Sequence, residues 1–485
     1  MSIPDNIKKY KPTDFGAVEI HACKGKYYVY KISSKWDSAL GKAKKVTGKC
    51  VGKITENDGF IPNEKAVMLS APKNPIVRNY GAFEITGQLA GDLENKLRQY
   101  FPDIFRELSV VARLRLVCGS TGKKIKYDFE KSYLSQLHPD LKVSDYTVKT
   151  LFSKLSDRKE QMEAFMRSYV KPGSRLLFDG TSIFSRADDS ACLTGYNPNH
   201  SLNTQVRLVY IFDRTSFLPV FYRMVPGNIV DRKTLKETIL SSGCSECIVI
   251  ADKGFYSKVN LSFLMQEQLK FILPLQSNTT LIDETFEKNP DDRKFDGRFV
   301  FKDRLIWFKK YPTGNLGNHV YLFRDDQRKS AAEVRFQNEL DSNWGEEEIT
   351  ETDFFANTRR GLYAFVSNID EKPLEIYMKY KERWDIEQCF DYLKNSVRIG
   401  ASYRRTNQEL EAWSFINHIS LLYFYGIVKA LREKKLNKNY TAEDIISIGK
   451  NIYRVNTDNS FRVSEISKDD QAVLDALGVD LFRKN

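Results

Sequence analysis

The sequence has few of the side chains that bind zinc or form disulfides. Its 485 residues include five histidines and seven cysteines, and the cysteines show no framework spacing. Cys244 and Cys247 form a Cys-x-x-Cys pair, but no second pair follows at a zinc-ribbon distance. These shortages argue against a zinc-centred or disulfide-stapled protein, and we expect the cysteines to be reduced.

Long apolar runs are missing as well. The chain contains no stretch of eighteen apolar residues, and no hydrophobic segment of a signal peptide follows its charged N-terminus. We therefore expect a cytoplasmic, nucleoid-associated protein with no membrane partner.

Positive charge exceeds negative charge. Lys and Arg number 75 against 63 Asp and Glu, which gives a net charge of +12. This balance favours a polyanionic partner, although a basic housekeeping enzyme would share it. Residues 1–60 contain twelve lysines and six acids interleaved with aromatic residues, so this segment could lie along a phosphate backbone.

Changes in residue pattern predict six segments. A basic β-rich module for DNA binding comes first, then a helical connector or DNA-end-binding region. An α/β core with a mixed sheet follows, interrupted by a β-rich insertion and resumed by a strand and a charged helix, before a helical C-terminal region for dimerisation. In order, these segments are 1–75, 76–170, 171–276, 277–360, 361–406 and 407–485.

The charged helix predicted at 380–394 carries the most informative pattern. At about 100° per residue, four of its side chains fall within roughly 60° of arc on one helix face. They are Tyr380, Arg383, Glu387 and Lys394. A carboxylate beside a phenol, a guanidinium and an ammonium suits a site that holds a metal ion and a phosphodiester. An exposed amphipathic helix has the same pattern, so this helix alone is compatible with a functional site and with a solvent-exposed surface.

Two aspartates that precede this helix in the sequence lie in predicted apolar strands. Asp179 lies in the strand predicted at 175–184, and Asp252 in the one predicted at 246–255. Buried carboxylates placed side by side raise each other's pKa, and a divalent cation relieves that cost. With Glu387 as third ligand, the set could hold two Mg²⁺ ions. Each aspartate alone could instead belong to a turn.

The ordered set of motifs resembles the DDE transposases of bacterial insertion sequences, in the group with the Y-x2-R-x3-E-x6-K signature. Every signature position is filled. The resemblance covers about residues 90–430, and its motifs are FDGTS around Asp179, GYNPNH at 195–200, PGNIVD at 226–231, ADKGF around Asp252 and YKERWDIEQCFDYLK around Glu387.

The resemblance implies an RNase H-like fold whose catalytic, metal-binding triad is Asp179, Asp252 and Glu387. The residues that it implies for contact with DNA phosphates are Tyr380, Arg383 and Lys394. It also accounts for the 387 − 252 = 135 residues between the second and third acids as a β-rich insertion.

By the same resemblance, the chain is expected to be a prokaryotic transposase. It would bind the terminal inverted repeats of an insertion sequence, cleave DNA and join the ends to target DNA. We expect two Mg²⁺ ions per site, with Mn²⁺ as a substitute, and a homodimer in a synaptic complex on double-stranded DNA. The alternatives are a structure-selective nuclease of RNase H-like fold and a catalytically idle, domesticated DNA-binding protein.

Four further residues outside the triad and the phosphate-contacting set also have expected roles. His200 and Arg207 could face DNA, although His200 could also cap a turn. Asp231 is expected to cap a helix at 231–241. Trp384 is expected to pack the charged helix against a neighbouring element.

Overall fold

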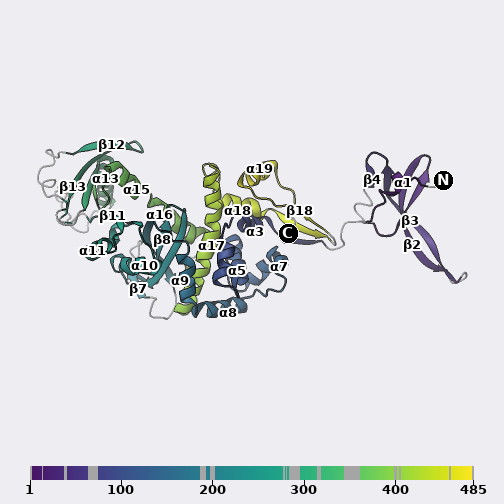
Figure 1. Cartoon of the computed structure of the whole chain (residues 1–485), viewed down its shortest axis with the longest axis horizontal. Helices are drawn as coiled ribbons and strands as arrows, with labels where there is room; N and C mark the ends of the chain where they lie inside the picture. Colours follow the sequence, from purple (N-terminus) through teal and green to yellow (C-terminus); the bar gives the residue numbers. More distant parts are fainter. Residues whose placement is uncertain are drawn as a thin grey trace. The chain divides into compact units, whose positions relative to one another are not determined.

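The computed structural model describes residues 3–13, 15–37, 41–63, 75–185, 193–196, 202–276, 279, 281–282, 295–313, 318–342, 361–397, 401–402, 406–457 and 460–482. The chain divides into two compact units (Figure 1). Unit 1 comprises Met1–Arg78 and Tyr453–Glu465, and unit 2 comprises Asn79–Ile452 and Ile466–Asn485.

Unit 1 contains an antiparallel four-stranded sheet in the order β1-β2-β3-β4. Its elements are α1 (Asp5–Lys8), β1 (Val18–Cys23), β2 (Lys26–Asp37), β3 (Lys42–Thr55) and β4 (Gly59–Pro62). Alternate apolar residues of the strands and one residue of α1 form a small core, consisting of Ile7, Val18, Ile20, Val29, Val51 and Ile54. A separate three-stranded sheet has the order β18 (Ser460–Val463), β17 (Tyr453–Thr457) and β5 (Ile76–Asn79).

A layer of helices forms one part of unit 2. It consists of α3 (Gly81–Gln88), α4 (Leu93–Tyr100), α5 (Phe105–Cys118), α6 (Lys124–Lys131), α7 (Leu134–Leu137), α8 (Asp145–Ser156), α9 (Lys159–Arg167), α17 (Asn407–Glu433), α18 (Ala442–Lys450) and α19 (Lys468–Leu477). Helix α17 is 27 residues long and buried around most of its circumference. It contacts α5 and α8 as well as strand β9, and thereby joins the helical layer to the sheet (Figure 1).

A large mixed sheet forms the other part of unit 2. Its strands are β6 (Arg175–Ser185), β7 (Leu193–Tyr196), β8 (Leu202–Asp213), β9 (Leu218–Pro226), β10 (Ile248–Ala251), β11 (Lys270–Pro274), β12 (Gly297–Phe301), β13 (Arg304–Pro312), β14 (His319–Asp325), β15 (Leu362–Ser367) and β16 (Ala401–Ser402). The main path runs β12-β13-β14-β15-β11-β10-β6-β8-β7, while β9 pairs with β8 and β16 with β6. The expected α/β architecture with a mixed sheet is confirmed.

The β-rich segment before the signature continues this sheet. Strands β12, β13 and β14 are antiparallel neighbours, and β14 pairs with β15, which in turn pairs with β11. The remaining elements are η1 (Asp231–Lys233), α10 (Leu235–Ser242), η2 (Lys253–Phe255), α11 (Lys258–Gln266), α13 (Asp326–Ser342), α15 (Pro373–Lys381), α16 (Trp384–Asp391) and the π turn η4 (Tyr392–Ser396).

None of the helices in the described part of the chain has both the length and the apolarity needed to span a bilayer.

Candidate active site

Asp179 and Asp252 lie side by side on neighbouring parallel strands. Asp179 belongs to β6, and Asp252 directly follows β10. The register between the two strands pairs Phe178 with Ala251, so the next residue of each strand is an aspartate. Because neighbouring strands are about 4.8 Å apart, both carboxylates can reach one cation.

The signature segment folds as two short helices, whereas its spacing predicts one continuous helix. Helix α15 ends two residues before Arg383, and α16 begins at Trp384. At the junction, the Arg383 N–H donates to the Tyr380 carbonyl at 3.0 Å, a tighter turn than in an α-helix. Lys394 lies in the wider π turn η4. These changes of winding mean that the four signature side chains do not share one regular helix face.

The Arg383 guanidinium meets all three acids of the predicted triad. Its Nη1 lies 2.9 Å from Asp179 Oδ2 and 3.7 Å from Asp252 Oδ1, and its Nη2 lies 2.5 Å from Glu387 Oε1. The side chain of Arg383 is 17% exposed. Residues separated by more than 200 positions in the chain are therefore gathered around a single positive charge.

Asp179 is the most buried of the three carboxylates. The pKa of Asp179 is raised to about 7, chiefly by burial and in part by the nearby carboxylate of Asp252. The Arg383 guanidinium and a 2.7 Å hydrogen bond from the Gly180 N–H oppose this rise in pKa. The site thus holds more negative charge than its single guanidinium neutralises.

Tyr380 and Lys394 lie close enough to these acids to sense their charge. Burial raises the pKa of Tyr380 to about 12, so the phenol keeps its proton at neutral pH. The Tyr380 ring packs against Phe365 of β15 in a tilted arrangement, with 4.2 Å between ring centroids. Burial lowers the pKa of Lys394, while the carboxylate of Asp179 raises it. All six residues predicted for the site therefore lie in one neighbourhood.

A second ion pair supports the same edge of the sheet. Arg207 of β8 binds Asp231, with 2.5 Å between Nη2 and Oδ1. A Cβ atom added at Gly180 would lie 3.0 Å from each of these two atoms, and one added at Gly254 would lie 2.9 Å from Asp231 Oδ2. The pair therefore packs against the glycines beside Asp179 and Asp252, which leave room for it.

The expected helix cap at Asp231 is wrong. Helix α10 starts at Leu235 after the 3₁₀ turn η1, its N-cap residue is Thr234, and no side chain caps it. The carboxylate of Asp231 faces Arg207 instead, and burial raises the pKa of Asp231. Both residues stand in or near motifs visible in the sequence, but only the strand pairing brings them together.

The packing expected for Trp384 is also wrong, because its side chain is 63% exposed. Its neighbour Arg383 turns toward the acids, and the tight junction places Trp384 in solvent. His200 lies outside the described residues.

No group of three His, Cys, Asp or Glu side chains in the described part of the chain is arranged to hold a metal ion as it stands. At the triad, the Arg383 guanidinium lies between the carboxylates, which explains why their oxygen atoms do not converge on one point as metal ligands would. The donor set nevertheless fits Mg²⁺, because it consists of oxygen atoms and two of its members, Asp252 and Glu387, are 35% and 39% exposed.

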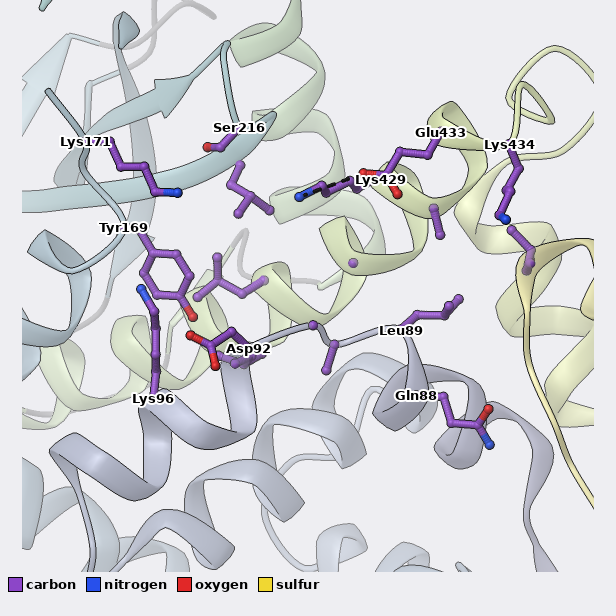
Figure 2. Close-up of a pocket in the computed structure, with 18 residues that line it drawn as sticks. Gln88, Leu89, Asp92, Lys96, Tyr169, Lys171, Ser216, Lys429, Glu433 and Lys434 are labelled. Atoms are coloured by element: carbon purple, nitrogen blue, oxygen red, sulfur yellow. Dashed lines mark ion pairs between the residues drawn. The ribbon is translucent and has the colours of Figure 1, made fainter. Parts of the chain in front are cut away.

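A cavity of about 460 Å³ lies elsewhere in unit 2 (Figure 2). Lysines from several elements surround it, namely Lys96, Lys171, Lys429 and Lys434. Lys96 is already engaged, because it donates to the Ser168 carbonyl at 2.8 Å and stacks over the Tyr169 ring. Neither the acids nor the signature residues described above line this cavity, so it is distinct from the candidate active site.

The family model of the transposase DDE domain matches residues 171–423, which is more than half of the chain. The chain belongs to the DDE transposase family. The match extends from the start of β6 into α17, and it includes all six residues gathered around the acids.

Comparison with solved structures finds a likeness between this DDE transposase and a piggyBac transposase. That structure is a synaptic complex with hairpin DNA. The two chains are 15% identical with a TM-score of 0.40, and the likeness covers 76% of this chain and 70% of the other. Among curated proteins, no match is found.

Proposed function

We propose that the chain is a DNA transposase in which Asp179, Asp252 and Glu387 hold divalent metal ions on an RNase H-like core. The single observation that carries this proposal is the contact of one guanidinium with all three carboxylates. When all three carboxylates are ionised, one guanidinium leaves an excess of two negative charges in a partly buried site, and the raised pKa of Asp179 reflects that excess. A divalent cation would neutralise that excess.

Magnesium is the ion that the donor set favours, with Mn²⁺ as a substitute and two ions per site. When bound, the ions would activate a water molecule or a 3′-hydroxyl and stabilise the leaving oxygen. The three carboxylates of the chain would orient this chemistry from fixed positions on β6, the end of β10 and α16.

Arg383 would act as a phosphate ligand once the metal ions hold the acids. Its guanidinium carries five donors, and a phosphate can accept two of them in parallel. Displacement from the carboxylates would free these donors beside the reacting phosphodiester. The guanidinium therefore balances the acids before metal binding and binds DNA afterwards.

Tyr380 and Lys394 would complete the phosphate site. Tyr380 keeps its proton because its pKa is raised to about 12, so its hydroxyl can donate to a phosphate oxygen. Lys394 supplies an ammonium near Asp179. Neither group takes a proton from the nucleophile in this scheme, and both act by positioning and by charge.

Asp231 and Arg207 would act as positioning residues. Their ion pair packs against Gly180 of β6 and Gly254 of η2, so it holds the backbone beside Asp179 and Asp252 at a fixed separation. Arg207 would not need to contact DNA for this role.

The proposed substrates are the terminal inverted repeats of a mobile element and a target duplex. Two ends must be joined in one reaction, so a homodimer assembled on DNA is the simplest arrangement. The helical C-terminal region is our proposed dimerisation element. Both substrates are polyanions, which the net charge of +12 favours as partners.

The test incubates the full-length protein with Mg²⁺, a duplex carrying the repeats that flank the gene, and a target plasmid. A transposase cleaves the repeat and joins the freed 3′ end to the plasmid. Cleavage without joined product would instead identify a structure-selective nuclease. Tight binding with no cleavage in Mg²⁺ or Mn²⁺ would identify an idle DNA-binding protein. Glu387→Gln is the matched control, because it removes one charge with little change of shape.

A further inference from the structure

Strands β2 and β3 of unit 1 continue beyond the rest of their sheet. Strand β1 pairs with β2 only as far as Lys31, and β4 pairs with β3 only from Gly52 onward. Farther out, β2 and β3 pair with each other alone, from Ser33 opposite Val46 to Asp37 opposite Lys42. The outer residue pairs of β2 and β3 therefore form a two-stranded ribbon that projects from the sheet (Figure 1). We call the stretches 33–37 and 42–46 the ribbon.

Both faces of the ribbon are open to solvent. Each side chain described in 33–36 and 42–46 is exposed, including the 68% exposed Trp36. A two-stranded hairpin is only marginally stable in water, because it has no core of its own. The ribbon is continuous with a sheet that does have a core, so it is held at its base and unsupported along its length.

Positive charge is concentrated on the ribbon and its base. Residues 31–49 contain six lysines and one acid, Asp37. Side chains alternate between the two faces of a strand, so the pairing register places three of these lysines and the one acid on the same face: Lys35, Lys42 and Lys44, with Asp37 opposite Lys42. Lys35 stands directly opposite Lys44, and like charges in that relation destabilise a strand pair.

Few acids of the chain offset this lysine face. Among the side chains that the structure describes, which do not include that of Asp37, no ion pair joins an acid to Lys35, Lys42 or Lys44, whereas Lys45 on the other face reaches Glu19 at 2.5 Å. Trp36 lies on the same face as Lys45, opposite Ala43. A narrow ribbon thus presents an excess of ammonium groups on one side and an exposed indole on the other, both of which a bound partner would stabilise.

We propose that the ribbon is a DNA-binding arm whose lysine face, Lys35, Lys42 and Lys44, contacts the phosphate backbone of duplex DNA. This inference rests on the proposed function for the identity of the polyanion. The major groove of B-DNA is wide enough to admit a two-stranded β-ribbon. A row of lysines would bind its phosphates through charge and without dependence on sequence.

The experiment compares full-length variants by fluorescence anisotropy with a labelled duplex that carries the flanking repeat, at several salt concentrations. Replacement of the three lysines of the lysine face by glutamine should weaken binding about 10-fold or more at ~0.1 M salt. It should also reduce the slope of log K against log salt by about 2.7, or 0.9 for each lost phosphate contact. The same three changes to arginine should preserve the slope, because the charge is kept.

A matched control removes the same charge from the other end of the same sheet. The exposed residues for this control are Lys24, Lys26 and Lys53, each changed to glutamine. This variant should bind DNA with a slope close to that of the unmodified protein. Equal loss in both triple variants would overturn the proposal, since the effect would then come from net charge alone.

Other outcomes separate this proposal from the proposed function. If the unmodified protein binds DNA and the glutamine variant of the lysine face keeps its full slope, the ribbon proposal is wrong and the transposase proposal stands. If the unmodified protein fails to bind any duplex, the proposed function itself fails. Thermal unfolding of each variant shows whether the fold is retained. We expect no decrease in Tm, because the substitutions are exposed and relieve repulsion.

Discussion

The triad and the ribbon both bring like charges together, but in opposite environments. At the triad, three carboxylates meet in a partly buried site, where low solvation makes their repulsion strong. On the ribbon, three lysines share an exposed face, where water screens them. The triad therefore requires an internal counter-charge, Arg383, while the lysine face keeps an excess of positive charge, because Asp37 is the one acid of the ribbon.

This difference indicates what each region binds. A buried cluster with a small guanidinium inside it suits a compact cation that enters between the side chains. An exposed row along two strands suits an extended polyanion that covers it from outside. The same physical cause, unbalanced charge, points to metal at one place and to DNA at the other.

The strongest test of the comparison is the loss of a triad charge. Glu387→Gln should reduce cleavage of repeat DNA by about 10³-fold, because one oxygen donor for the metal ions is weakened. DNA affinity should change little, since the variant leaves the proposed phosphate ligands Arg383 and Lys394 and the lysine face of the ribbon unchanged. Cleavage by a gel assay and affinity by anisotropy measure the two effects separately. Unchanged cleavage would remove Glu387 from the proposed triad.

Loss of the ion pair between Arg207 and Asp231 should reduce cleavage less than loss of a triad carboxylate. Asp231→Asn should lower kcat for cleavage by about 30-fold, because a weakened pair with Arg207 lets the backbone beside Asp179 and Asp252 move. The apparent affinity for Mn²⁺, followed by electron paramagnetic resonance, should fall as well. A variant with normal Mn²⁺ affinity and normal kcat would show that the pair only stabilises the fold.

Arg383→Gln tests whether the guanidinium balances the charge of the three acids and competes with metal ions for them. Without metal, the three acids lose their counter-charge, and the free energy of unfolding should decrease by about 2 kcal/mol, a figure discounted for partial exposure. Added Mg²⁺ should then raise the Tm of the variant more than that of the unmodified protein. An equal response to Mg²⁺ would mean that the guanidinium does not compete with metal at the acids.

The smallest expected effect is on the pH dependence of stability, and it concerns His418, which lies outside both the triad and the ribbon. Burial lowers the pKa of His418 to about 3, below its ordinary value of 6.5. The unfolded chain binds a proton that the folded chain rejects, so this contribution to stability is full above pH 6.5 and is lost as the pH falls from there toward 3. At pH 5 the loss is about 2 kcal/mol or less.

His418→Phe should therefore flatten the decrease in stability between pH 7.5 and pH 5, as measured by urea unfolding. The ring lies near Tyr210 and Tyr222, where a phenyl group can pack. Variants of the ribbon lysines serve as controls, because their exposed ammonium groups stay charged over this range. An unchanged slope in His418→Phe would assign the acid sensitivity to other groups.

Much of the catalytic sheet could be predicted from apolar runs. The strand predicted at 175–184 corresponds to β6 (Arg175–Ser185), because a run of buried residues bounded by polar ones leaves few alternatives. The strand predicted at 246–255 is shorter, since β10 ends at Ala251 and a 3₁₀ turn follows Asp252. The motif Asp-Lys-Gly carried the signal for that turn.

The signature helix was predicted less well. Helical periodicity correctly indicated helix on both sides of Arg383, but it assumed constant winding from Tyr380 to Lys394. The tight junction and the π turn depend on contacts made by the folded segment, such as the 2.8 Å ion pair between Glu382 and Arg175. Periodicity contains no information about such distant partners.

The sequence by itself determined the family and the order of the chemistry: one acid in an apolar strand and one directly after another, a third acid with its basic and phenolic neighbours, and a lysine-rich beginning. Such features depend on residue type and short-range spacing, which the linear chain states directly. Tertiary structure decided that Arg383 faces the acids, that Arg207 and Asp231 pack beneath them, and that two strands extend as an open ribbon. Those arrangements arise from strand register and from contacts between distant residues, which no local pattern specifies.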